Sequence, residues 1–443
     1  MRTYLLLTVS GRGMKVVLWM VTLLASATVA HPRAQTESWE GLIHGGEHGW
    51  VNLRDYNVLP ANPGEVNRAN LQRAIDEASS MGGVLFLEPA AEGYDIASGV
   101  ILKQNVSLIG GSPVSPRGSK HPDREAPVGS LIKITDDAHP FLAVQSGTAI
   151  SNIQFWYPDQ SFDDPVSIIT YPPTITLAND QRVEGVTLSS LTFYGEYETM
   201  NFRATREQHC ELLLIRDCYG YPLSGKFIAI DYCYDIPRIL DCHVNPAIMR
   251  RFGRTYGKAM VDAVIRNGTY AYVIDHTDNA QLMDVFCFGT YGGILLGEES
   301  YGQLTNFNFD CVTLGIHKKG ANTFNRNWMV AQGSIIANTG GHVTDIHPIL
   351  VEGSGHLSIS NVEAFSGHNP ALTTVGKSYD YMTVRNAKNL TVAISGARMA
   401  NYTADHPLTI ESLEGVTIVV STSFDKHNQL VSGIQRQRNQ FKK

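Results

Sequence analysis

A short phrase recurs along this chain at intervals of about two dozen residues. It is a run of alternating apolar residues that often contains Asn or Asp and commonly ends in Gly. The spacing is clearest at the cysteines, where Cys218 to Cys242 and Cys287 to Cys311 are equal steps. Short strands at a fixed period predict a solenoid, in which each repeat packs only against its neighbours. Examples of the phrase are NVSLIGG (105–111), VTLSSLTFYG (186–195), LLLIRDCYG (212–220), TNFNFDCVTLG (305–315) and KNLTVAISG (388–396).

The pattern predicts an all-β fold, a single-stranded right-handed parallel β-helix. Alternating apolar runs dominate residues 233–311, so no amphipathic helix longer than about two turns is expected there. Before the repeats, residues 51–58 and 84–89 read as strands. A helix is expected over 68–80, with Leu71, Ile75 and Ala78 on one face, and it should cap the open N-terminal end.

Composition and charge limit the class of protein. The chain has 443 residues, of which 43% are hydrophobic and 17% charged, so a large core is available. The net charge of −7 and the lack of a long basic block argue against a nucleic-acid partner. Residues 45–430 are expected to form the β-helix domain and 431–443 a basic tail, while the oligomeric state is left open.

The N-terminus reads as a targeting segment. Lys15 precedes an apolar run at 16–24, and small residues follow up to Ala30. Residues 1–30 are therefore expected to be a secretory signal peptide, with an N-terminal membrane anchor as the alternative. No later segment reads as a membrane span, so the mature protein is expected to be secreted, either extracellular or periplasmic.

The order of the N-terminal elements resembles that of a known superfamily. A strand, a helix, GGVLFLEP (82–89), YDI (94–96) and NVSLIGG (105–111) are similar to the pectate-lyase-like β-helix proteins. Within them, the chain looks like bacterial proteins related to glycoside hydrolase family 28. The resemblance implies a β-helix and a carbohydrate substrate. The family's N-T-D, D-D, G-H-G and R-I-K patterns are not intact here, so polygalacturonase activity does not carry over.

The six cysteines should mark the interior of the stack. The period places Cys233 over Cys210, Cys242 over Cys218 and Cys311 over Cys287. They could pack as small hydrophobic side chains or form disulfides between rungs, since rungs about 4.8 Å apart lie within disulfide range. No C-x₂-C pair suggests a metal site.

If the cysteines point inward, their sequence neighbours should point outward, because side chains alternate along a strand. Asp217 and Asp241 should then lie side by side on neighbouring rungs, with His243 and Tyr219 on the same face. Two close carboxylates separate their pKa values, which is what glycoside hydrolysis requires of its acid and its base or nucleophile. The alternatives are solvated surface acids or a Ca²⁺ site.

Other residues could take part. Asp231 and Asp235 form an alternate acid pair followed by Arg238, which could instead be a salt bridge that stabilises a turn. The segment DHTDNAQ (275–281) is also acidic but reads as a turn. The remaining candidates are rings and cations that could contact a sugar: Tyr232 and Tyr234, Trp156 and Tyr157 in the expected loop 155–174, Lys226, and Arg250 and Arg251 in the expected loop 249–258.

Three functions stay open at this point. The first is a secreted enzyme that cleaves the glycosidic bonds of a polysaccharide by hydrolysis, with no cofactor and no metal required. The second is a polysaccharide lyase that performs β-elimination on a uronate polymer, for which Ca²⁺ is a possible cofactor. The third is a β-helix protein that binds carbohydrate without catalysis.

Overall fold

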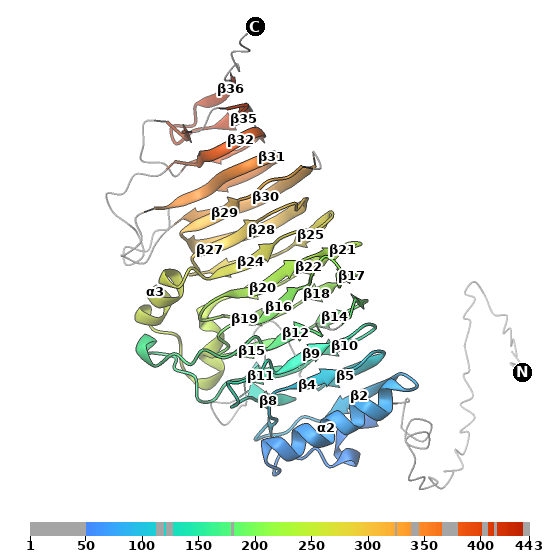
Figure 1. Cartoon of the computed structure of the whole chain (residues 1–443). Coiled ribbons are helices and arrows are strands. Elements are labelled where there is room, and N and C mark those ends of the chain that lie inside the picture. The colour runs from blue at the N-terminus through green and yellow to red at the C-terminus, as the bar shows by residue number, and fades with distance from the viewer. Residues whose placement is uncertain are drawn as a thin grey trace, which may run out of the picture.

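The chain winds into a stack of rungs that runs from residue 50 at one end to residue 436 at the other (Figure 1). The computed structural model describes residues 50–111, 119–120, 127–178, 181–323, 326–337, 345–365, 380–400, 406–411 and 414–436. The expected signal peptide at 1–30 lies outside the described residues. The strands pair in parallel from rung to rung, which confirms the expected right-handed parallel β-helix.

Each rung contributes to three parallel sheets. The first, here called the front sheet, contains β4 (Val100–Leu102), β9 (Leu142–Val144), β12 (Ile175–Leu177), β16 (Met200–Arg203), β20 (Lys226–Asp231), β24 (Tyr270–Ile274), β27 (Gly292–Leu296), β29 (Leu314–Lys318), the first parts of β31 (His347–Ala364) and β32 (Met382–Ser395), and β34 (Leu408–Ile410).

The second sheet follows the front sheet along each rung. It contains β1 (Trp50–Asn52), β2 (Gly83–Leu87), β5 (Val106–Gly110), β10 (Ala149–Ser151), β14 (Thr187–Ser189), β18 (Leu214–Arg216), β22 (Arg238–Leu240), β25 (Ala280–Met283), β28 (Gly302–Val312), β30 (Asn327–Ala337), parts of β31 and β32, and β35 (Thr417–Phe424).

The third sheet completes the rung. It contains β3 (Tyr94–Asp95), β8 (Leu131–Lys133), β11 (Gln154–Trp156), β15 (Thr192–Tyr194), β19 (Tyr219–Gly220), β23 (His243–Val244), β26 (Phe286–Phe288), β33 (Arg398–Met399) and the later parts of β28, β30, β31 and β35. Smaller pairings join β13 (Val183–Glu184), β17 (Cys210–Glu211) and β21 (Cys233–Tyr234), join β6 (Ser119–Lys120) to β7 (Pro127–Val128), and add β36 (Leu430–Arg436) antiparallel to β35.

A single residue in the left-handed backbone conformation joins the second sheet to the third on successive rungs. Asp217 (φ 54°) and Asp241 (φ 53°) are two of these residues. Asn and Asp tolerate this conformation better than other residues with a side chain, which explains why the repeated phrase carries them at this point. We call this set the turn row; it comprises Asn152, Ser190, Asp217, Asp241, Asp284, Asn306, Gln332 and Asn361.

Cysteines fill part of the core, and all six are buried free thiols. Cys210 pairs with Cys233 in the strand register, as expected. The prediction that Cys311 lies over Cys287 is wrong, because Phe309 holds that position and Cys311 occupies an irregularity of β28 with a φ of 54°. The rung is two residues shorter there than the cysteine spacing suggested.

Helices occupy the N-terminal end and one edge of the front sheet. Helix α2 (Gly64–Ser79) lies at the N-terminal end in Figure 1 and packs against β2, β4 and β5. That it caps the solenoid stays a prediction. The expected strand 51–58 is shorter, since β1 is followed by the 3-10 helix η2 (Leu53–Tyr56).

The rung between β20 and β24 carries a helical insertion. The 3-10 helix η4 (Pro246–Phe252) leads to the α-helix α3 (Lys258–Arg266), which protrudes beside the front sheet in Figure 1. The expectation of no sizeable helix between 233 and 311 is therefore wrong, because α3 buries Met260 and Val264 against the loops at this edge. A further 3-10 turn, η3 (Pro165–Ser167), lies in the 155–174 segment.

Candidate functional site

Asp217 and Asp241 lie side by side in the turn row. They reach the surface through left-handed turns rather than through the strand alternation that led to their prediction. Together with Ser190, Arg216 and His243 they line a groove of about 610 Å³. A third carboxylate, Asp284, follows Asp241 on the next rung, since Leu240 pairs with Met283.

The surroundings of these turn-row acids are open to solvent and include hydroxyl and amide partners. Ser190 Oγ donates to Asp217 Oδ2 at 2.7 Å, and Asn306 Nδ2 donates to Asp284. Partial burial raises the pKa of Asp241, and the charges of Asp284 and Asp217 add to the effect while Arg216 opposes it. The side chain of Asp241 is nevertheless exposed, so solvent screens these charges.

Asp231 lies on a different face, at the end of front-sheet strand β20. Its neighbour on the next rung is Asp275, because Ile230 pairs with Ile274 and each Asp follows directly. The predicted partner Asp235 is not brought beside Asp231. Asp235 lies in the turn before β22, where its backbone N–H donates to Asp278 Oδ1 at 3.0 Å.

The surroundings of Asp275 shift its carboxyl toward the protonated form. Burial raises its pKa, and the negative charge of Asp231 raises it further. The backbone N–H of Glu298 donates to Asp275 Oδ1 at 3.1 Å and partly opposes this shift. A Cβ atom on Gly297 would lie 1.6 Å from Asp275 Oδ1, so only glycine leaves room for the carboxyl here.

Asp231 has basic neighbours. Arg203 precedes it in the same register on β16, and His276 Nδ1 lies 2.9 Å from Asp231 Oδ1. The His276 ring stacks on Tyr232, with ring centroids 4.3 Å apart and planes 6° from parallel. The aromatic stack fixes the imidazole beside the carboxylate, as the orienting group of a catalytic carboxylate would be held.

Two cations lie on this face within electrostatic range of Glu198 and Asp275. In the part of the chain that the structure describes, the Lys226 ammonium and the Arg203 guanidinium form no side-chain hydrogen bond or ion pair. Burial lowers the pKa of Lys226, and the nearby Arg203 charge adds to that. Burial also raises the pKa of the adjacent Glu198, which accepts a hydrogen bond from Asn201 at 3.2 Å. We call Arg203, Lys226, Asp231, Asp275 and His276 the front-sheet cluster.

Sequence reasoning placed Asp231 and Lys226 among the candidates but missed the residue that stands beside Asp231. The signal was available, because FIAID (227–231) and AYVID (271–275) both end in Ile-Asp. The insertion of η4 and α3 lengthens the rung between them and hides the period. The composition of 275–281 is typical of a turn, yet its first residue directly follows front-sheet strand β24.

Some predicted sugar-binding rings are internal. Tyr219 stands in register with His243, on the face where it was expected, but Tyr219 and Tyr157 are both buried and neither ring offers a face to solvent. The bulk of both side chains packs the third-sheet layer, where Tyr157 Oη lies 2.7 Å from Thr174 Oγ1. Trp156 belongs to β11 rather than to a loop and packs on Phe252 with centroids 4.6 Å apart.

The remaining candidates are spread over several surfaces. Arg238 is an exposed residue of the second sheet, in register with Gln281. Tyr234 lies edge-on to His209, with centroids 5.7 Å apart. Arg250 and Arg251 lie in η4, where Arg250 lines a separate cavity of about 400 Å³. His243 stacks on Phe286 at the turn-row groove, with centroids 4.3 Å apart.

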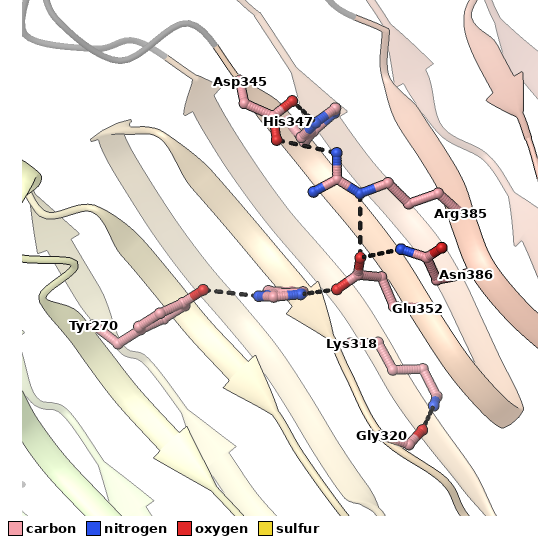
Figure 2. A network of polar contacts seen from close by, with 9 residues as sticks. Tyr270, Lys318, Gly320, Asp345, His347, Glu352, Arg385 and Asn386 are labelled. Carbon is pink, nitrogen blue, oxygen red and sulfur yellow. Dashed lines mark hydrogen bonds and ion pairs between the residues drawn. The ribbon is translucent and has the colours of Figure 1, made fainter.

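A second polar network covers the outer face of later front-sheet rungs (Figure 2). His317 Nδ1 lies 2.8 Å from Tyr270 Oη, and its Nε2 lies 2.8 Å from Glu352 Oε2. Arg385 donates from Nε to Glu352 and from Nη1 to Asp345. Burial lowers the pKa of His317, although Glu352 opposes this. The charges pair within the network, which links the strands β24, β29, β31 and β32.

Among the described residues, no group of three or more His, Cys, Asp or Glu side chains has the arrangement of a metal site. Over the same residues, no helix has the length and apolar character needed to cross a bilayer.

Comparison with known proteins establishes the fold. No protein-family model matches the chain, and no curated protein matches its sequence. Among solved structures it is similar to DFA-IIIase from Arthrobacter chlorophenolicus A6 in complex with GF2, with 12% identity, a TM-score of 0.56, and coverage of 87% of this chain and 97% of that one.

Two further solved structures are similar. The Agl-KA catalytic domain shares 9% identity with a TM-score of 0.54, over 84% of this chain and 68% of that one. The N-terminal fragment of bacteriophage Phi29 gene product 12 shares 12% identity with a TM-score of 0.48, over 84% of this chain and 66% of that one. The chain is thus a right-handed parallel β-helix protein, the fold that the pectate-lyase-like resemblance implied.

Proposed function

We propose that this protein is a secreted enzyme that hydrolyses glycosidic bonds of a polysaccharide, and that Asp231 and Asp275 carry the reaction. The observation behind the proposal is their arrangement on adjoining front-sheet strands, where burial and the charge of Asp231 raise the pKa of Asp275. Glycoside hydrolysis uses such a pair, one carboxyl that holds a proton and one that is ionised.

The roles follow from the surroundings. Asp275 donates its proton to the leaving glycosidic oxygen as the C–O bond breaks, and Asp231 acts as base or nucleophile on the other side of the sugar. If Asp231 is the nucleophile, water hydrolyses the glycosyl ester and its proton returns to Asp275. If Asp231 is the base, it takes the proton of the attacking water, and exchange with solvent reprotonates Asp275. His276 orients Asp231 through the 2.9 Å contact, and Lys226 and Arg203 offer donors to polar groups of the substrate.

The comparisons support catalysis over a purely binding role. One similar structure is an enzyme by name, DFA-IIIase, and another is a catalytic domain, that of Agl-KA. The Asp217 and Asp241 pair predicted from the sequence is the alternative location of the same reaction, with Asp235, His243 and Arg238 as further candidates. It ranks second because Asp241 is exposed and the pair is not flanked by cations on both sides.

A lyase is the second candidate function. It is favoured by Lys226 and Arg203, whose positive charges could neutralise a uronate carboxylate before β-elimination. Only this alternative could call for Ca²⁺ as a cofactor.

A panel of neutral and uronate polysaccharides, assayed for new reducing ends, tests the proposal. Hydrolysis produces reducing ends without ultraviolet absorbance, whereas elimination adds a conjugated double bond that absorbs. We expect reducing ends without absorbance. Products that absorb would replace the hydrolase proposal with the lyase, and no cleavage of any polymer in the panel would contradict both.

A further inference from the structure

The corner where the second and third sheets meet forms a long groove on the outside of the β-helix. Two cavities lie in it, one of about 610 Å³ that starts at Ser190 and one of about 550 Å³ that extends to Asn361. Asp284 lines both cavities, so they form one groove along the axis. The proposed reaction uses the front sheet and leaves this groove without a role.

The two walls of the groove differ in chemistry. The turn row supplies one polar side chain per rung, including Asn306 and Gln332. The opposite wall comes from the outward residues of the third sheet, which stand in register from rung to rung and begin with the stacked rings of His243 and Phe286. The wall continues through Asn308, Ser334 and Glu363.

Polar atoms in this groove lack hydrogen-bond partners. Asn308 Oδ1 is buried and accepts no hydrogen bond from any described residue. In the same part of the chain, the side-chain amide of Gln332 also makes no hydrogen bond. A buried carbonyl oxygen without a donor destabilises the folded chain. A ligand that carries hydroxyl groups would supply the missing donor.

We propose that this groove binds a neutral polysaccharide chain, lying along the helix axis, at a site separate from bond cleavage. Rungs repeat about every 4.8 Å, so an extended chain of sugars meets a fresh polar side chain at each rung. The rings of His243 and Phe286 offer a surface for the apolar C–H face of a sugar. Asp217, Asp241 and Asp284 disfavour an anionic polymer in the same groove.

The test measures binding without turnover. Affinity gel electrophoresis of the full chain in an Asp275→Asn background is run with dextran, inulin and laminarin as neutral polymers and polygalacturonate as the anionic one. Phe286→Ala removes the ring platform, and Gln332→Gly removes a groove amide while keeping the left-handed backbone (φ 54°). Asn152→Gly is the matched control, because Asn152 belongs to the turn row but lines neither cavity.

We expect at least one neutral polymer to retard the protein more than polygalacturonate does. Phe286→Ala should weaken that binding about tenfold and Gln332→Gly by a smaller factor, with Asn152→Gly within about twofold of the parent. Retardation by none of the neutral polymers, or equal binding by Gln332→Gly, Phe286→Ala and the control, would overturn the proposal. Because only binding is read, failure of the proposed hydrolysis would leave the result interpretable.

Discussion

The front-sheet cluster and the turn row each place carboxylates on neighbouring rungs, yet they surround them differently. Asp231 and Asp275 lie among Arg203, Lys226 and His276, and burial is the main cause of the raised pKa of Asp275. The turn-row acids lie in an open groove beside hydroxyl and amide partners. The stacking of rungs therefore brings acids together in both places, while burial and flanking cations distinguish a pair suited to proton transfer from a row of exposed acids.

The largest effect is expected from Asp231→Asn. Loss of the base or nucleophile should lower kcat/KM about a thousandfold or more, a typical contribution of such a group. The matched variant Asp217→Asn removes a carboxylate from the turn row and should leave kcat/KM within about threefold of the wild type. Initial rates of reducing-end release measure both. Equal losses in the two variants would remove the distinction between the regions.

The pH dependence should follow Asp275. Its folded-state pKa is raised, and a general acid must be protonated, so kcat/KM should fall about tenfold per pH unit once the pH exceeds that pKa. In Asp231→Asn the pKa of Asp275 should drop, because the second-largest cause of its shift is gone. NMR titration of the carboxyl carbon checks this. A pKa of Asp275 that is the same in both proteins would show that the two acids do not interact.

Replacing a cation should have a smaller effect on the kinetic constants, and only at the front-sheet cluster. Lys226→Gln is expected to raise KM about tenfold with little change in kcat, since Lys226 would bind the substrate without reacting. Arg216→Gln is the counterpart at the turn-row groove and should change neither constant. Steady-state kinetics at low and high salt measure KM and kcat for both variants. A fall in kcat with KM unchanged would contradict a binding role for Lys226.

The smallest effect is on stability. The folded-state pKa of Asp241 is raised, so the folded protein holds more protons than the unfolded chain and loses stability as the pH rises above the unfolded value. Asp241→Asn should therefore raise stability at neutral pH by about 0.5 kcal/mol or less, given solvent screening. Asp275→Asn should raise stability at neutral pH by more than Asp241→Asn does, because Asp275 is more buried. Thermal unfolding at neutral and acidic pH tests the order; a gain that persists at acidic pH would point to another cause.

Much of the architecture could be predicted from the sequence. The repeat period and the alternation of apolar residues gave the β-helix, and Cys210 stacks on Cys233 as expected. The alternation placed Tyr219 on the same face as His243, but it could not show that Tyr219 is buried there, because burial depends on tertiary packing over that face.

The site was harder to predict than the fold. The neighbour of Asp231 is 44 positions further along the chain, since η4 and α3 interrupt the rung between them. No local spacing shows that contact, and burial of a carboxyl depends on loops whose packing the sequence does not reveal. The predicted Asp217 and Asp241 are adjacent, but their exposure depends on the shape of the corner between two sheets.

The most direct test of the account compares Asp275→Asn with Asp241→Asn on the same polysaccharide. Both changes replace a carboxyl whose pKa is raised with an amide of the same shape, one in the front-sheet cluster and one in the turn row. We expect kcat/KM to fall about a thousandfold for Asp275→Asn and to stay within about threefold for Asp241→Asn. Full activity in Asp275→Asn together with loss in Asp241→Asn would contradict the front sheet as the site of the reaction.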